Sequence, residues 1–214
     1  MTYAENLWLY TALVFGIIVV PGMDMLFVLT NALTGGRPAG LSATAGIMAG
    51  GAVHTLSGAV GVGILLRTAP WLFTVALFAG AAYMVWIGVT LIRSSITVQA
   101  VGAAASRSRW TAFRQGLVTC LLNPKAYLFV VSVFPQFMKP QYGPLWRQAL
   151  AIGAITVAMQ FAVYGALALA AGRSRTVLTS SPGATILIGR AAGVLFVLVA
   201  LVTAWHGLGG AVSS

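Results

Sequence analysis

The sequence predicts an all-α integral membrane protein with six transmembrane helices, arranged as two inverted-topology repeats of three helices. Of the 214 residues, 59% are hydrophobic and only 7% are charged, whereas an average soluble domain is about 25% charged. Six apolar runs are each long enough to cross a bilayer core, which takes about 20 residues per helix. A proline followed closely by a charged residue interrupts the first and the fourth run, so we expect helices 1 and 4 to be broken.

The six predicted spans follow one another along the chain. They are residues 7–33, 41–66, 71–92, 111–138, 145–171 and 184–205. The first and fourth are long because each contains its break. Strands of a membrane barrel would alternate polar and apolar residues over about ten positions, and none of these runs does so. The first run continues past Pro21 and has Glu5 ahead of it, so we interpret it as a helix and not as a removable signal peptide.

Basic residues predict the orientation. Eight arginines lie in or beside the connections after the first, third and fifth spans, namely Arg37, Arg93, Arg107, Arg109, Arg114, Arg173, Arg175 and Arg190. Three basic residues lie beside the other two connections, namely Arg67, Lys139 and Arg147. Basic connections stay in the cytoplasm, so we expect both termini on the outer face of the membrane. Four tryptophans then fall at outer span ends, namely Trp8, Trp71, Trp146 and Trp205.

The chain is expected to be one transmembrane transporter domain, residues 1–214, made of two halves. Repeat 1 covers about 1–93, a cytoplasmic linker about 94–110, and repeat 2 about 111–214. An offset of 103 residues places Pro21 on Pro124. Each half has an odd number of spans, so the second half enters the membrane from the opposite side. Such repeats form a binding site at their shared interface that can open to either side.

Two charges lie where a membrane span should have none. Asp24 is inside the first span and Lys125 inside the fourth. A charge at bilayer depth costs about 2.5–3.5 kcal/mol on insertion scales and usually serves an ion or a substrate. Each follows a helix breaker, Pro21-Gly22 in one half and Asn123-Pro124 in the other. Broken helices at corresponding positions of two halves are typical of a transporter binding site.

Two interpretations of the charges stay open. Asp24 and Lys125 could form a structural ion pair, which adds little net stability because desolvation offsets attraction. Alternatively, Asp24 carries a proton or holds a substrate's ammonium, and Lys125 binds the carboxylate together with free backbone amides after Pro124. A small zwitterion such as an amino acid suits this second arrangement. Pro21, Gly22, Asn123 and Pro124 would shape the backbone there or merely kink packed helices.

Four further polar residues could line a polar path through the bundle. His54 ends a Gly46-x3-Gly50-x3-His54 ladder, whose glycines permit close helix packing. Its imidazole titrates near neutral pH, so it could relay protons, or it could bond a neighbouring helix. The same two interpretations, path lining or interhelical bonding, apply to Asn31, Tyr127 and Gln160.

These motifs resemble the LysE/RhtB (lysine exporter / homoserine-threonine exporter) family. The first half carries Val20-Pro21-Gly22-Met23-Asp24-Met25-Leu26, Asn31-Ala32, and Gly40-Leu41 leading to Gly46, Gly50 and His54. The second half carries Gly116-Leu117, Leu122-Asn123-Pro124-Lys125-Ala126 and Phe134-Pro135-Gln136-Phe137. Met23 stands where the family usually has a second proline. The resemblance implies a secondary active inner-membrane exporter of amino acids or close derivatives, coupled to a proton or ion gradient (proton antiport) by alternating access.

Composition limits the alternatives. We expect no enzyme, no cofactor and no metal site, because a metal exporter would gather several acids, histidines or thiolates and only Asp24 and His54 qualify. The single Cys120 excludes a disulfide within the chain and a redox pair. No Gly-rich phosphate loop supports ATP coupling, and the basic residues do not form a nucleic-acid patch. An exporter of another small solute or metal ion, or a non-transporting scaffold, stays open. The expected partners are a small zwitterionic substrate and membrane lipids, and a homo-oligomer stays open.

Overall fold

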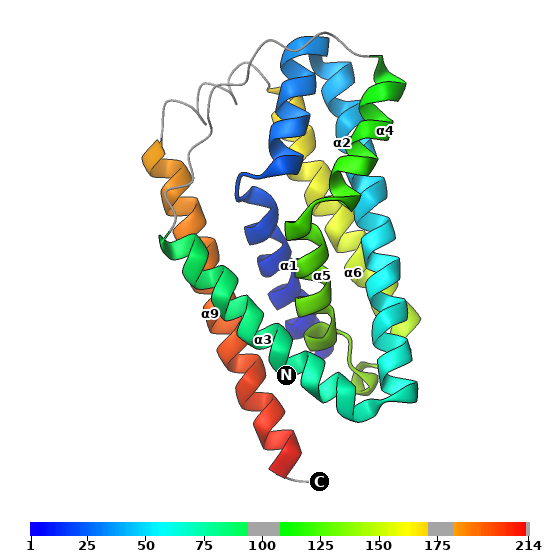
Figure 1. The fold of residues 1–214 in the computed structure, drawn as a ribbon, viewed down its shortest axis with the longest axis vertical. Helices are drawn as coiled ribbons and strands as arrows, with labels where there is room; N and C mark the ends of the chain where they lie inside the picture. The colour runs from blue at the N-terminus through cyan, green and yellow to red at the C-terminus, as the bar shows by residue number, and fades with distance from the viewer. Residues whose placement is uncertain (94–107, 171–181, 213–214) are drawn as a thin grey trace.

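The computed structural model describes residues 1–93, 108–170 and 182–212, and all secondary structure within them is helical (Figure 1). The elements are α1 (Tyr3–Val19), α2 (Met23–Thr68), α3 (Pro70–Arg93), α4 (Arg109–Leu121), α5 (Pro124–Phe137), the 3-10 turn η1 (Pro140–Tyr142), α6 (Leu145–Gln160), the π-helical segment η2 (Phe161–Gly165), α7 (Ala166–Leu169) and α9 (Pro182–Val212). The predicted all-helical, apolar architecture is confirmed.

The structure does not by itself establish six membrane crossings. By length and hydropathy, two of the described helical segments qualify as spans, Met23–Thr68 and Leu145–Leu169. A third qualifies if the bent pair α4 and α5 counts as one span. Shorter apolar helical stretches cover Tyr3–Val19, Phe78–Thr90 and Arg190–Val202. The six-span inverted repeat therefore stays a prediction.

The two predicted helix breaks are confirmed, and both are shorter than expected. α1 ends at Val19 and α2 begins at Met23, so only residues 20–22 are non-helical and Asp24 already lies in the first turn of α2. α4 ends at Leu121, and α5 begins at Pro124 with Lys125 inside its first turn. Proline fits a first helical position because its missing N–H would have no partner there. The breaks thus place both charged residues at helix N-termini and not in unwound chain.

The predicted connection between the first two spans, residues 34–40, is shorter in the structure than expected. These residues belong to α2, whose only non-helical position is Gly36, with φ 74° and ψ −179°. Only glycine adopts such angles readily, so one residue redirects the chain without a separate loop. Figure 1 shows the result as two arms of α2, residues 23–35 and 37–68, which lie side by side.

The predicted linker, residues 94–110, lies mostly outside the described residues. Its last three residues are described, and they start a helix. Ser108 caps α4 by accepting a hydrogen bond from the Thr111 N–H at 3.2 Å, and Arg109 and Trp110 form the first turn. The second predicted repeat therefore begins slightly earlier than residue 111.

Helices α1, α2, α4, α5 and α6 form a bundle, and α3 and α9 cross each other on one side of it (Figure 1). α3 and α9 approach closely at two glycines. A Cβ added to Gly88 would lie 2.6 Å from the carbonyl oxygen of Gly193, and a Cβ added to Gly193 would lie 2.5 Å from that of Gly88. Small residues allow such close packing between membrane helices.

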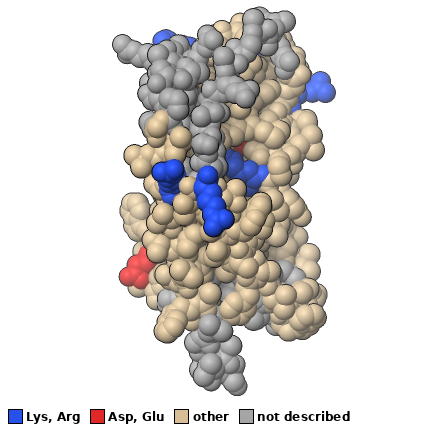
Figure 2. All heavy atoms as spheres, turned by 60° about the vertical axis from the view of Figure 1, so that its left-hand side comes forward, with Lys and Arg blue, Asp and Glu red and all other residues tan. Residues whose placement is uncertain are grey.

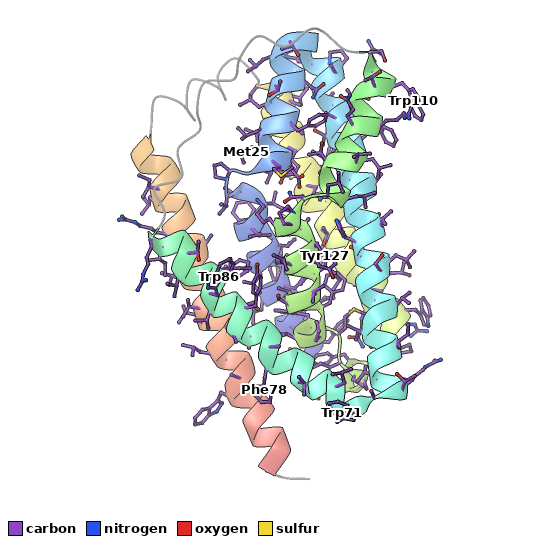
Figure 3. The ribbon with its side chains drawn as sticks, in the orientation of Figure 1. Met25, Trp71, Phe78, Trp86, Trp110 and Tyr127 are labelled. Atoms are coloured by element: carbon purple, nitrogen blue, oxygen red, sulfur yellow. The ribbon has the colours of Figure 1, made fainter. Side chains whose placement is uncertain are left out.

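The surface carries exposed tryptophans and few charges. The predicted interfacial tryptophans are all 60% exposed or more: Trp8, Trp71, Trp146 and Trp205. Trp71 and Trp110 lie at opposite ends of the molecule (Figure 3). The face in Figure 2 is mostly uncharged, as a lipid-facing surface would be.

Candidate functional site

The two helix breaks lie against each other inside the bundle. The Lys125 ammonium, from the first turn of α5, donates hydrogen bonds to the carbonyl oxygens of Ile17 at 2.9 Å and Val20 at 3.0 Å. These carbonyls belong to the end of α1, where the helix leaves its last carbonyls without internal partners and carries partial negative charge. A Cβ added to Gly22 would lie 3.1 Å from the Lys125 Nζ. Lys125 of the second break therefore bonds directly to the backbone of the first break.

Asp24 and Lys125 face one cavity but do not form a direct ion pair. Within the described residues, no carboxylate oxygen lies within 4.0 Å of the Lys125 ammonium. Asp24 is 4% exposed, and its Oδ1 has no hydrogen-bond partner. Its carboxyl interacts electrostatically with Lys125 and His54 across the cavity. The interpretation of the two charges as a closed structural ion pair is therefore wrong for this conformation.

Asn123 has a second role beside that of helix cap. Its Oδ1 accepts a hydrogen bond from the Lys125 N–H at 3.0 Å, which starts α5. Its amide lies close enough to Asp24 to interact with the carboxyl, yet its Nδ2 is buried without a hydrogen-bond partner. The break thus holds one unpaired buried donor, on Asn123, and one unpaired buried acceptor, on Asp24. Unpaired buried polar atoms are rare in native proteins and call for an explanation.

His54 lies on the second arm of α2 and reaches the other break. Its Nε2 lies 3.0 Å from the carbonyl oxygen of Cys120, near the end of α4. A carbonyl only accepts, so Nε2 carries the hydrogen and donates it. Cys120 itself is buried. His54 therefore bonds a neighbouring helix, as one interpretation predicted, and it also lines the cavity, so a relay role stays untested.

The cavity between the breaks has a volume of about 50 Å³. We call its apolar lining residues together the apolar wall and its polar lining residues together the polar wall. The apolar wall comprises Val14, Ile17, Ile18, Ala126, Phe129, Val130 and Phe134; the remaining lining residues are Tyr10, Asp24, Gly51, His54, Thr55, Cys120, Lys125, Thr156, Gln160 and Tyr164. The Tyr10 hydroxyl lies 2.7 Å from the Thr156 hydroxyl. Ligand pockets usually measure about 300–1,000 Å³, so this site has to widen to admit an organic substrate.

Gln160 joins the cavity from α6, immediately before the π-helical segment η2. It is 6% exposed, and its Oε1 is buried without a partner. A Cβ added to Gly51 would lie 2.6 Å from that oxygen, so Gly51 makes the room for the amide. Short π-helical segments are frequent at functional sites. Gln160 is the third unpaired buried polar group near this cavity.

Asn31 and Tyr127 were predicted to line a polar path, and neither lines the cavity. Asn31 is buried, but its amide donates to the carbonyl oxygen of Phe27 in its own helix at 2.9 Å. Tyr127, labelled in Figure 3, is 56% exposed. It follows Lys125 by two residues, which is about 200° around a helix of 3.6 residues per turn, so it points away from the site. Pro21, Gly22 and Pro124 shape the two breaks and do not line the cavity.

Sequence reasoning missed half of the polar residues that line the cavity. Tyr10, Thr55, Thr156 and Tyr164 were not among the predicted site residues. The available signal was their position inside apolar runs, where a polar side chain needs a partner. The described chain brings no three His, Cys, Asp or Glu side chains together in a way that could hold a metal ion.

Comparisons with known proteins agree with these features. The profile of the LysE type translocator family matches residues 15–207. An uncharacterized membrane protein of Vibrio cholerae is 33% identical over 78% of this chain and 81% of its own. A homoserine/homoserine lactone efflux protein of Salmonella typhimurium is 29% identical over 84% and 86%. A leucine efflux protein of Enterobacter sp. is 38% identical over 62% and 64%.

No solved structure matches the chain. The family profile covers nearly its whole length, including both helix breaks and every residue of the cavity except Tyr10 and Val14. The chain belongs to the LysE type translocator family.

Proposed function

We propose that this protein is a secondary active exporter of amino acids or close derivatives in the bacterial inner membrane. The observation that carries the proposal is the cavity between two broken helices, which holds one carboxylate, Asp24, and one ammonium, Lys125, that do not pair directly. Relatives named for the efflux of leucine and of homoserine support an amino-acid substrate.

The charges of the cavity match those of a zwitterion. The substrate ammonium would donate to the unpaired Oδ1 of Asp24, and the Asn123 amide would donate to the substrate carboxylate beside Lys125. Both contacts would satisfy groups that are unpaired without substrate, and hydrogen bonds to charged groups are the strong ones. The apolar wall would receive an aliphatic side chain, while Gln160 would meet a polar one.

Lys125 would couple binding to a conformational change. Its ammonium now holds the end of α1 through Ile17 and Val20. A substrate carboxylate would compete with those carbonyls for the same ammonium, which loosens the contact between the two breaks. The cavity must also expand from about 50 Å³. Both requirements support alternating access around a site at the midplane.

The proposal includes the predicted topology and coupling. Both chain ends lie toward one end of the bundle, and the Gly36 turn lies at the other (Figure 1), which supports an even number of crossings. The two breaks, separated by about 103 residues and facing each other, support an inverted repeat of residues 1–93 and 111–214 within a single domain. Asp24, with His54 acting on it across the cavity, would exchange the coupling proton.

The test is counterflow in proteoliposomes that contain the purified full chain. Vesicles preloaded with leucine, homoserine or lysine are diluted into a trace of the same labelled amino acid, with protein-free vesicles as the control. We expect labelled uptake for at least one of these amino acids, and net efflux that responds to an imposed pH gradient. Absence of counterflow across a full panel of amino acids, with correctly folded protein, would contradict transport and favour a scaffold.

A further inference from the structure

A long apolar groove lies on the bundle surface between the second arm of α2 and α6. Its volume is about 1070 Å³. The lining residues are Ala52, Thr55, Leu56, Ala59, Val60, Gly63, Ile64, Arg67 and Thr68 from α2, with Pro144, Leu145, Trp146, Ala149, Leu150, Gly153, Ala154 and Val157 from α6 and the residue before it. Small residues form much of it, and large exposed aliphatic side chains such as Leu56 and Leu150 project beside them.

The dimensions of the groove match one leaflet of a membrane. Along α6 it runs from Trp146 to Val157, roughly 16 Å at a rise of about 1.5 Å per residue. A leaflet's share of the hydrocarbon core is about 15 Å, half of the total of about 30 Å. Trp146 marks one end, and tryptophan prefers the membrane–water interface. The groove therefore extends from the interface to the middle of the membrane.

Positive charge gathers at the interfacial end of the groove. Arg67 lies in the last turn of α2 and lines this end. Arg147 lies over the ring of Trp146, with its Cζ 5.2 Å from the ring centroid. The chain has only two acids: Asp24 is in the central cavity, and Glu5 accepts from the Thr2 N–H at the start of α1. Neither arginine has a carboxylate partner within 4.0 Å in the described residues.

We propose that this groove is a specific site for an anionic phospholipid. One acyl chain lies between α2 and α6, and the headgroup phosphate accepts hydrogen bonds from Arg67, with Arg147 beside it. Arginine binds phosphate through two parallel N–H donors. An apolar slot of leaflet depth with unpaired arginines at its interfacial end fits both parts of such a molecule.

A second copy of the chain fits the groove less well. A two-fold contact brings the same surface of both copies together. Arg67 and Arg147 of each copy would then face those of the other, and no acid of the described chain lies there to offset them. The charge complementarity favours a phosphate over a second copy.

The lipid would also contact the wall of the transport site. Thr55 lines both the groove and the central cavity, and a Cβ added to Gly153 would lie 3.2 Å from the Thr55 Cγ2. The inner end of the acyl chain would therefore rest against a side chain that lines both spaces. This gives the lipid a position from which it can stabilise the contact between α2 and α6.

Native mass spectrometry of the purified full chain tests the site. The protein is titrated with phosphatidylglycerol, with phosphatidylcholine of the same acyl chains, and with glycerol phosphate as the headgroup alone. We expect preferential retention of phosphatidylglycerol, and no competition by glycerol phosphate. Arg67→Gln should lower that retention about tenfold, the size expected when a charge-assisted hydrogen bond is lost.

Matched variants distinguish binding of the lipid headgroup from binding of the acyl chain. Arg67→Lys should keep part of the preference, and Arg37→Gln, a cation at the opposite end of the bundle, should keep all of it. Gly63→Leu, whose side chain fills the groove, should lower retention of both lipids. Each variant is first shown to fold by its helical circular dichroism. The proposal is overturned if Arg67→Gln binds phosphatidylglycerol normally, if glycerol phosphate competes fully, or if Leu150→Cys cross-links two copies without any change in lipid retention.

Discussion

Asp24 and Lys125 line one cavity and do not bond to each other directly. The Lys125 ammonium is held by the carbonyls at the end of α1, and one carboxylate oxygen of Asp24 has no partner. A buried charge without a full set of hydrogen bonds is costly. The proposed site would complete the bonding of both residues with a substrate, whereas mutual neutralisation would need a direct contact that the structure does not contain between them.

Neutralising the two charges separately tests this explanation. We expect Asp24→Asn to fold with near-normal yield and to lose efflux by at least about tenfold, because a bond to a charged group is worth about 1.5–3 kcal/mol. Lys125→Met should lower both yield and efflux, because it leaves two α1 carbonyls unpaired. The double variant should recover yield in part and efflux not at all. Folded yield and substrate efflux are measured separately.

The control for this cycle is Glu5→Gln, which removes the chain's only other acid. Glutamine can still complete the capping box with Thr2, so yield and efflux should stay at wild-type levels. Efflux near wild type in the Asp24→Asn, Lys125→Met double variant would show that neither charge takes part in transport.

A substitution at Gln160 tests whether the polar lining of the cavity contributes to substrate selection. Its Oε1 is buried and unpaired, and such a group destabilises a fold by about 1–3 kcal/mol. Gln160→Leu should therefore fold with equal or higher thermal stability, while the efflux of homoserine falls relative to that of leucine. Thermal unfolding and the ratio of the two counterflow rates are the measurements. A loss of stability with an unchanged ratio would assign Gln160 a purely structural role.

Among the helices, the two breaks at prolines were predictable from the sequence. The form of the turn at Gly36 and the π-helical segment after α6 were not. Pro21 and Pro124 remove backbone donors and mark both interruptions in the sequence. The turn at Gly36 lies within the predicted seven-residue connection, residues 34–40, yet one glycine redirects the helix. The π-helical segment Phe161–Gly165 has no breaker ahead of it, so the sequence marked Gln160 as a candidate residue without indicating the irregular helix that follows it.

Gly36 should be intolerant of any side chain. At φ 74° and ψ −179°, a residue with a Cβ is strained by about 1–3 kcal/mol, so Gly36→Ala should lower thermal stability. Gly61 in the same helix is the control, because an added Cβ there meets nothing within 4 Å. Gly61→Ala should leave stability unchanged or raise it by up to about 1 kcal/mol. Equal unfolding temperatures for the two variants would show that the angle at Gly36 is not required.

For the whole molecule, the sequence predicted the helical class and the two breaks better than it predicted the packing between helices. Composition predicted an apolar helical protein, and the paired breakers predicted that the two breaks would face each other. The contribution of Tyr10 and Thr156 to the cavity could not be predicted. Their contact joins residues 146 positions apart and depends on how α1 packs on α6. Pairing of this kind is set by side-chain packing between helices, which hydropathy does not encode.

The predicted orientation of the molecule rests on its charge distribution, and it gives the last prediction. Lys and Arg on the face in Figure 2 lie in its middle and upper parts, toward the Gly36 turn, and basic ends stay in the cytoplasm. The opposite end carries η1, so Gln141→Cys should react with an impermeant maleimide in intact cells. Ala103→Cys, in the predicted cytoplasmic linker, should react only after the cells are opened. The native Cys120 is buried, so the unsubstituted protein sets a low background. Labelling of position 103 but not of position 141 in intact cells would invert the topology and the direction of transport proposed for the site.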